Sequence, residues 1–219
     1  AIGLYTSRVV LNTLGVTDYG IYNVVGGVVS LFTFLSGSMG TASQRYITFA
    51  LGYGDKSYLE KVFSISLFIH LLLSLFIVAL AETVGLWLLN NYMQIPENRV
   101  DAAFWVYQFS IMTCVVSLLS VPYNSAIVAH ERMQAFAYIS ILEVVLKLAI
   151  VYVLLVSSID KLKLYALLMF TVQLLIRFVY GAYCNRHFEE TRFKFVYDRS
   201  LVNKMMGFAS WNLFGSVAS

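Results

Sequence analysis

The sequence predicts an all-α integral membrane protein, and three observations carry that prediction. Hydrophobic residues make up 59% of the 219 residues and charged residues only 12%, whereas a soluble domain has about 45–50% and about 25%. The mean hydropathy is +0.75. Several apolar runs approach or exceed the roughly 20 residues that a helix needs to cross about 30 Å of hydrocarbon, which barrel strands never do. We therefore expect a bundle of transmembrane helices.

Glycine, proline, asparagine and charged residues divide the chain into six apolar segments and the start of a seventh. The predicted helices cover about residues 1–14, 21–47, 62–89, 102–129, 135–156 and 164–183, and the seventh opens near residue 201. The short connectors make consecutive helices antiparallel neighbours. We interpret residues 1–185 as one transmembrane lobe, 186–200 as a cytoplasmic inter-lobe loop and 201–219 as the truncated start of the next helix, in a chain that is a fragment of a longer protein.

The first three segments differ in their polar residues. The run 1–14 is closed by "GVTDYG", a stretch rich in turn formers. The segment 21–47 carries small residues, which let membrane helices approach closely. The segment 62–89 contains His70, which we interpret as hydrogen-bonded packing, with a proton relay as the alternative.

The fourth and fifth segments contain residues that a bilayer-spanning helix rarely tolerates. In 102–129, Pro122 lacks an N–H and bends its helix, which makes it a candidate gate, with ordinary bending as the alternative. In 135–156, Glu143 and Lys147 are four residues apart, in the order that favours a contact on one helix face.

The sixth segment repeats polar residues at helical spacing. Gln173, Arg177 and Tyr180 share one face. Arg177 lies too deep in the segment to be a loop residue.

Cations at membrane depth are the strongest functional signal in the sequence. They are Arg8, Lys147 and Arg177. A charge at the centre of a transmembrane helix costs about 2.5–3.5 kcal/mol, and the single carboxylate of Glu143 cannot neutralise three cations. The alternative is that these side chains reach headgroups or only hold helices together. We expect instead a wet cavity that receives an anion, with Arg45 lining its cytoplasmic mouth or anchoring the helix end.

Basic residues gather at alternate ends of the predicted helices. One set of ends holds Arg45, Lys56, Lys61, Arg132, Arg186, Arg192, Lys194, Arg199 and Lys204. The other set holds only Arg99, Lys161 and Lys163. Because cytoplasmic loops carry the excess of Lys and Arg, the first set is cytoplasmic.

Several other function classes find no support in the sequence. Cys114 and Cys184 lie in different segments without metal-type spacing, and the three histidines are on different elements, so we predict no metal site. A basic stripe for nucleic acid is missing. With no catalytic constellation or phosphate loop in view, we predict a protein that is not an enzyme and needs no cofactor.

The order of motifs resembles a known family. The stretch "SRVVLNTLGVTDYGIYNVVGGVVSLFTFLSGSMGTASQRYI" looks like the start of the polysaccharide (O-antigen repeat-unit) flippases. The later "VPYNSAIVAHERMQAFAYISILEVVLKL" is similar to their fourth-to-fifth helix hairpin. These proteins belong to the multidrug, oligosaccharidyl-lipid and polysaccharide exporter superfamily.

The resemblance implies the amino-terminal lobe of a two-lobe, alternating-access transporter in the bacterial inner membrane. Its implied cargo is an undecaprenyl-pyrophosphate-linked oligosaccharide for surface polysaccharide such as lipopolysaccharide. Implied partners are membrane lipid, a polysaccharide polymerase and a chain-length regulator. Pyrophosphate suits the four cations Arg8, Arg45, Lys147 and Arg177, and Glu143 would be the charge partner of Lys147.

Two alternatives stay open. The first is a cation-coupled multidrug extruder of the same superfamily, which tends to carry ionisable acids in this lobe, whereas the candidates here are mainly basic. The second is a membrane-embedded glycan polymerase or glycosyltransferase, which is expected to have a large loop with catalytic carboxylates. The outer loops of this chain are short.

Overall fold

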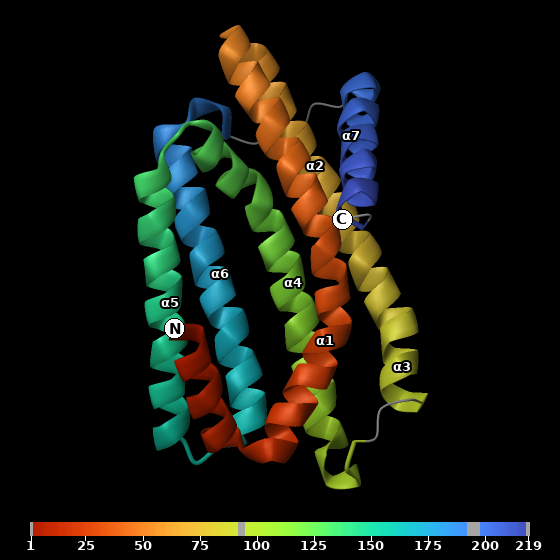
Figure 1. The fold of residues 1–219 in the computed structure, drawn as a ribbon, viewed down its shortest axis with the longest axis vertical. Helices are drawn as coiled ribbons and strands as arrows, with labels where there is room; N and C mark the ends of the chain where they lie inside the picture. The colour runs from red at the N-terminus through yellow and green to blue at the C-terminus, as the bar shows by residue number, and fades with distance from the viewer. Residues whose placement is uncertain (1, 92–94, 192–197, 218–219) are drawn as a thin grey trace.

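The chain folds into long helices that run roughly along one direction and are joined by short connectors (Figure 1). This computed structural model describes residues 2–91, 95–191 and 198–217. The described residues are almost entirely helical and contain no strand. The predicted fold class, an all-α membrane protein, is confirmed.

The helices coincide with the predicted apolar segments and extend beyond most of them. Their bounds are α1 Ile2–Tyr53, α2 Lys56–Leu80, α3 Leu86–Asn91, α4 Val100–Ala129, α5 Met133–Val156, α6 Lys161–His187 and α7 Arg199–Val217. A π-helical turn, Ala81–Gly85, joins α2 to α3, and 3-10 turns lie at Glu97–Arg99 and Glu189–Thr191. Part of the predicted inter-lobe loop, residues 192–197, lies outside the described residues.

Among the described residues, four helical runs are long and apolar enough to cross a bilayer. They are Lys56–Leu89, Glu97–Ala129, Met133–Val156 and Lys161–His187. Together with the family assignment below, these runs identify a multi-pass membrane protein.

α1 is two helical segments joined at Gly15. Gly15 has φ 83° and ψ 166°, a conformation that is essentially restricted to glycine. The segment 2–14 therefore turns back at Gly15 and leaves the segment 16–53 at a sharp angle (Figure 1). The sequence predicts a six-residue connector, "GVTDYG", whereas one residue makes the break and residues 16–20 are already helical.

The turn between α1 and α2 is also shorter than the sequence predicts. Gly54 has φ 70° and ends α1. Asp55 then caps α2, because its Oδ1 accepts hydrogen bonds from the backbone N–H groups of Ser57 and Tyr58. Two residues therefore suffice where the hydropathy pattern leaves a longer gap.

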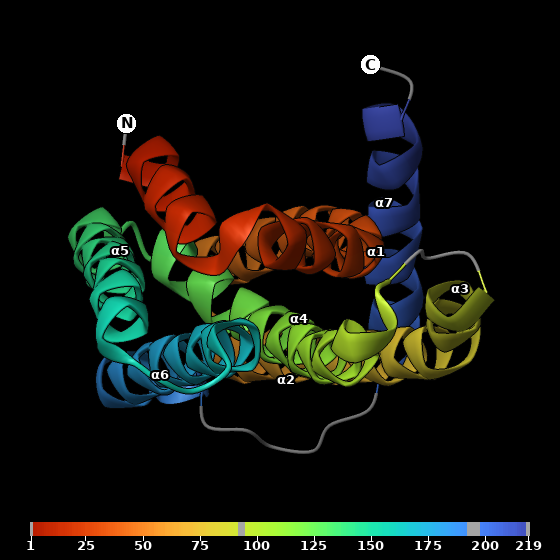
Figure 2. The same ribbon diagram turned by 90° about the horizontal axis from the view of Figure 1, so that it is seen from below.

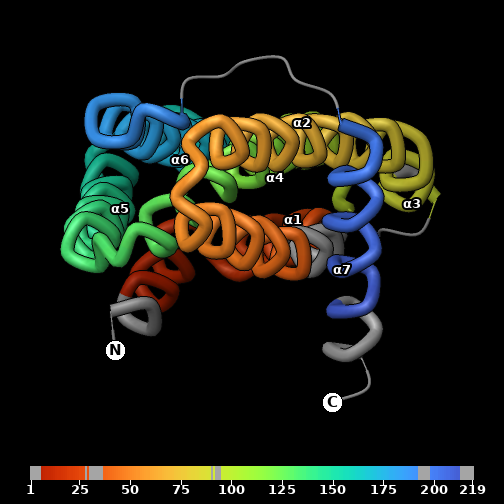
Figure 3. Tube along the Cα trace, turned by 90° about the horizontal axis from the view of Figure 1, so that it is seen from above, coloured from red at the N-terminus to blue at the C-terminus, as the bar shows by residue number. Residues whose placement is uncertain are grey.

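α4 lies at the centre of the bundle and packs against α1, α2 and α6 (Figures 2 and 3). α5 packs on α6, and α7 packs on α1 at the opposite side of the bundle. Two apolar clusters fill the interior, one toward the α1–α2 and α4–α5 turns around Phe63 and Ile127 and one toward the other end of the bundle around Val106 and Leu118.

A seam of small polar residues joins α1, α2 and α4. The Ser66 hydroxyl donates to the Ser43 hydroxyl over 2.6 Å, and the Ser125 hydroxyl donates to the Gly40 carbonyl over 3.3 Å. His70 is fully buried, and its Nδ1 lies 2.8 Å from the Ser66 carbonyl. Small residues and interhelical hydrogen bonds hold helices together in lipid. The His70 contact instead lies within α2, and the His70 Nε2 is buried without a hydrogen-bond partner in the described part of the chain.

Candidate functional site

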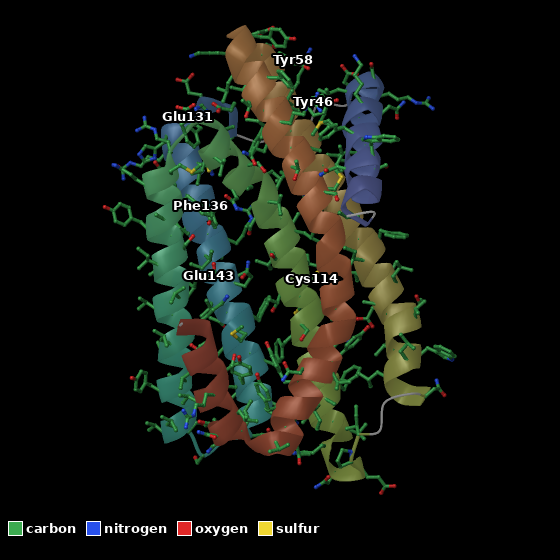
Figure 4. The ribbon with its side chains drawn as sticks, viewed as in Figure 1. Tyr46, Tyr58, Cys114, Glu131, Phe136 and Glu143 are labelled. Atoms are coloured by element: carbon green, nitrogen blue, oxygen red, sulfur yellow. The ribbon has the colours of Figure 1, made fainter. Side chains whose placement is uncertain are left out.

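Glu143 and Lys147 form an ion pair on α5. The Lys147 Nζ donates to the Glu143 carboxylate over 2.6 Å. Both side chains are partly buried, on the stripe of α5 that also carries the buried residues Ile139, Ile150 and Leu154. In Figure 4 Glu143 lies between α5 and α6. The pair therefore faces the bundle and not the lipid.

Arg177 of α6 is held by an aromatic ring. Its guanidinium carbon lies 3.9 Å from the centroid of the Tyr123 ring on α4. This is a cation–π contact, which favours a desolvated cation without consuming its N–H donors. Gly181 leaves room for the guanidinium, since a Cβ at that position would lie 3.0 Å from an Arg177 nitrogen. Arg177 forms no ion pair with any residue that the structure describes.

Tyr180 connects Arg177 to the ion pair on α5. It is buried on the same face of α6 as Arg177, on the side of α6 where Ser140 and Glu143 of α5 lie within electrostatic range of its hydroxyl. The two cations predicted on α5 and α6 and the one carboxylate therefore belong to one polar cluster. We call Tyr123, Glu143, Lys147, Arg177 and Tyr180 the α5–α6 cluster.

The other two predicted cations lie apart from this cluster. Arg8 is exposed on the segment 2–14 and has no ion pair in the described part of the chain. Arg45 is at the α1–α7 contact, where its guanidinium carbon lies 4.3 Å from the Phe208 ring centroid and 5.4 Å from that of Phe49. Of the two roles expected for Arg45, this contact resembles an anchor between helices.

Pro122 lies buried within α4, which continues as one helix from Val100 to Ala129. Next to it, the Ser120 hydroxyl donates to the Val116 carbonyl over 2.8 Å. The neighbouring Asn124 Oδ1 is buried without a hydrogen-bond partner in the structure as described. Whether Pro122 acts as a gate stays a prediction.

A second polar region, at the end of the bundle that holds the Gly15 break and the α5–α6 connector, was not recognised from the sequence. Arg99 binds the carboxylates of Asp18 and Asp160, the latter over 2.7 Å. Asp160 also caps α6 through the N–H groups of Leu162 and Lys163. The turn before α4 is thus joined through Arg99 to the start of the helical segment 16–53 and to the connector between α5 and α6. The sequence offered one indication of this region: the stretches around Asp18, Arg99 and Asp160 contain acidic residues beside few basic ones.

A cavity of about 510 Å³ opens at the opposite end of the bundle, between the α1–α2 turn, the α4–α5 turn and the end of α6. Three of the residues that line this cavity contact one another. His130 pairs with Glu190, and its ring stacks on the Phe188 ring with the two centroids 4.0 Å apart. Burial alone would raise the pKa of Glu190, but hydrogen bonds from His130 and the backbone, with the charges of His130 and Lys56, lower it below its ordinary value of 4.5.

A smaller pocket of about 220 Å³ lies between α1, α4 and α6. Its polar lining residues are Tyr22, Ser110, Thr113, Ser117 and Gln173, and Cys114 forms part of its wall. No cluster of three or more His, Cys, Asp or Glu side chains suitable for a metal ion occurs in the described residues.

Comparison with known proteins gives one match. The MatE family model matches residues 2–153, and no curated protein or solved structure matches. The superfamily of MatE includes multidrug transporters and flippases of polysaccharide and lipid-linked oligosaccharide. The match covers well over half of the chain and includes α1, α2, α4 and α5. The chain therefore belongs to the MatE family of membrane transporters.

Proposed function

We propose that this chain is the amino-terminal lobe of a flippase that moves undecaprenyl-pyrophosphate-linked oligosaccharides across the bacterial inner membrane. The family assignment supports transport of a solute or lipid by a multi-pass membrane protein. The choice of cargo rests on the charge of the bundle interior.

The observation that carries the proposal is an unpaired cation on the packed face of a membrane helix. Arg177 has an aromatic partner and no carboxylate partner among the described residues. Keeping a charge at this depth is costly unless it is used, and a pyrophosphate is a strong anion that accepts the paired N–H donors of a guanidinium. Lys147, one helix away, would supply a second positive charge.

Glu143 gives the Lys147 ammonium group a partner within the bundle. The ion pair satisfies the ammonium group when no substrate is bound. An arriving pyrophosphate would compete with Glu143 for the ammonium and draw Lys147 toward the α6 side. Arg8 would add charge further along the path, and release toward the periplasm would restore the Lys147–Glu143 pair.

A multidrug extruder of the same family is the second candidate. It is favoured by the partly exposed carboxylate of Glu143, an ionisable acid of the kind that binds cationic drugs or coupling ions. In that case Lys147 would move away from Glu143 when a cation binds.

Leaflet-resolved accumulation of the lipid-linked oligosaccharide tests the proposal in cells that carry the complete gene. Lys147→Ala and Arg177→Ala should insert normally and leave substrate on the cytoplasmic face. Arg186→Ala is the matched control, because Arg186 is an exposed arginine near the end of the same helix. Arg177→Lys should recover little, since lysine lacks the planar fork of donors.

Two results would overturn the proposal. Full transport in both alanine variants would exclude the α5–α6 cluster as the substrate site. An unchanged lipid distribution after deletion of the gene, together with drug accumulation, would establish the extruder instead.

A further inference from the structure

The pocket between α1, α4 and α6 is neutral and rich in hydrogen-bonding groups. Five of its lining residues carry a hydroxyl or amide, and no charged side chain of the described residues lines it. Figure 2 shows α4 between α1 and α6, with α5 beside α6. We call this space the neutral pocket.

Three polar side chains of the neutral pocket have no partner of their own. Ser110, Ser117 and Gln173 form no hydrogen bond with any residue that the structure describes. Thr113 donates its hydroxyl hydrogen to the Phe109 carbonyl over 2.7 Å, which leaves its oxygen free to accept. At membrane depth, an unpaired donor or acceptor is energetically costly, and a hydrogen bond from water or a ligand removes that cost.

The chemistry of these groups selects the kind of ligand. Hydroxyl and amide groups both donate and accept, and they match a ligand that does the same at several adjacent positions. A volume of about 220 Å³ is below the roughly 300–1,000 Å³ of pockets for drug-sized molecules. A single sugar ring meets both conditions. An apolar drug meets neither, and a bare anion fits the volume but only accepts hydrogen bonds.

The neutral pocket is next to the α5–α6 cluster. Gln173 precedes Arg177 by four residues on α6, so the two side chains share a face and are about 6 Å apart along the helix axis. In the orientation predicted from the basic residues, α6 runs toward the cytoplasm, and Gln173 lies on the non-cytoplasmic side of Arg177. A ligand whose anionic group contacts Arg177 would therefore extend its next group into the neutral pocket.

We propose that the neutral pocket binds the sugar that is attached directly to the pyrophosphate, with Gln173 and Ser117 as the groups that recognise its hydroxyls. This inference rests on the proposed function, because it takes Arg177 as the pyrophosphate contact. It adds a specificity site for the first sugar, separate from the charges that recognise any prenyl pyrophosphate.

Binding to the purified complete protein in lipid nanodiscs tests the inference. The probes are a polyprenyl pyrophosphate that bears one hexose and the same lipid without the sugar. Wild type should bind the glycosylated lipid about threefold to tenfold more tightly, the effect of one or two neutral hydrogen bonds. Gln173→Leu should lose this preference while it still binds the sugar-free lipid.

Two further variants complete the test, one inside the neutral pocket and one outside it. Ser117→Ala removes one pocket hydroxyl with little risk to folding and should reduce the preference in part. Thr171→Val is the matched control on α6, because Thr171 is exposed and its hydroxyl bonds only to the Leu167 carbonyl. It should keep the full preference.

The outcomes separate this inference from the proposed function. If wild type binds both lipids equally and Arg177→Ala weakens both, the neutral pocket has no role and the proposed function stands. A preference that survives in both Gln173→Leu and Ser117→Ala also overturns the inference. If wild type binds neither lipid, the proposed function fails and the inference fails with it.

Discussion

The guanidinium of Arg99 lies against the carboxylate of Asp18, although 81 residues separate them in the sequence. Asp18 follows the Gly15 break in α1 and is buried, and Arg99 ends the connector before α4. The pair therefore fixes the start of the segment 16–53 against the base of α4. Asp160 extends the contact to the connector between α5 and α6.

Arg99→Gln should destabilise the protein. Removing one partner of a fully buried ion pair costs about 3–5 kcal/mol. Because the Arg99 side chain is 29% exposed, we expect a smaller loss, which comes mainly from leaving the buried Asp18 carboxylate without its partner. Thermal unfolding of the purified protein in detergent measures the change. Lys163→Gln is the control, since the Asp101 carboxylate that it contacts is largely exposed and such pairs contribute about 0–1 kcal/mol. Equal melting temperatures in the two variants would contradict a structural role for Arg99.

Gly15→Ala should disturb the first segment of α1. The backbone at Gly15 occupies a region that costs other residues about 1–3 kcal/mol. We expect a lower melting temperature and weaker insertion of residues 2–14. Gly20→Ala is the matched control, because Gly20 is helical and a Cβ there meets no atom within 4 Å. Alanine at position 20 should be neutral or slightly stabilising, and a similar effect at both positions would argue against strain at Gly15.

Gly85→Ala should clash with Tyr107. A Cβ on Gly85 would lie 1.9 Å from the Tyr107 hydroxyl, which donates to the Ala81 carbonyl over 2.6 Å. Overpacking of this kind costs about 1–3 kcal/mol. The double variant Gly85→Ala, Tyr107→Phe should recover part of the loss in melting temperature, since the nearest ring carbon would then be 3.0 Å away. Failure of Tyr107→Phe to help would place the clash elsewhere.

Glu190→Gln should weaken the dependence of stability on acid pH. The pKa of Glu190 is lowered in the folded protein, so the folded state binds fewer protons than the unfolded state. Its contribution is therefore complete above the ordinary carboxyl pKa of 4.5 and is lost as pH falls through the folded-state value. Unfolding measured from pH 7 to pH 3 should show a smaller loss in the variant than in wild type.

The control for this measurement is Glu189→Gln. Glu189 pairs with Lys56 over 3.0 Å, but both side chains are exposed. Such a pair adds little to stability. A pH profile that changes as much in Glu189→Gln as in Glu190→Gln would contradict the role of the His130–Glu190 contact.

Local features of the site could be predicted from the sequence, whereas contacts between helices could not. The spacing of Glu143 and Lys147 predicts their contact, because both residues belong to one regular helix. The Arg177–Tyr123 contact depends on how α4 and α6 pack, which hydropathy does not determine. The four predicted cations were therefore grouped by charge alone, and the structure brings only Lys147 and Arg177 into one cluster.

The ends of the helices show a second limit. Hydropathy marks the part of a helix that lies in lipid, so it ends the second segment at residue 47 although α1 continues to Tyr53. The capping residues Asp55 and Asp160 were readable signals for the starts of α2 and α6. The neutral pocket could not be predicted, because its serines and Gln173 become neighbours only when α1, α4 and α6 pack together.

The α1–α2 hairpin has a mechanical consequence. At 1.5 Å per residue, the segment 16–53 is about 57 Å long, nearly twice the hydrocarbon thickness of about 30 Å. Its tip rises beyond the ends of α4, α5 and α6 (Figure 1). The hairpin is thus a rigid lever arm in which a small tilt within the bilayer becomes a large displacement of the Gly54–Asp55 tip in water.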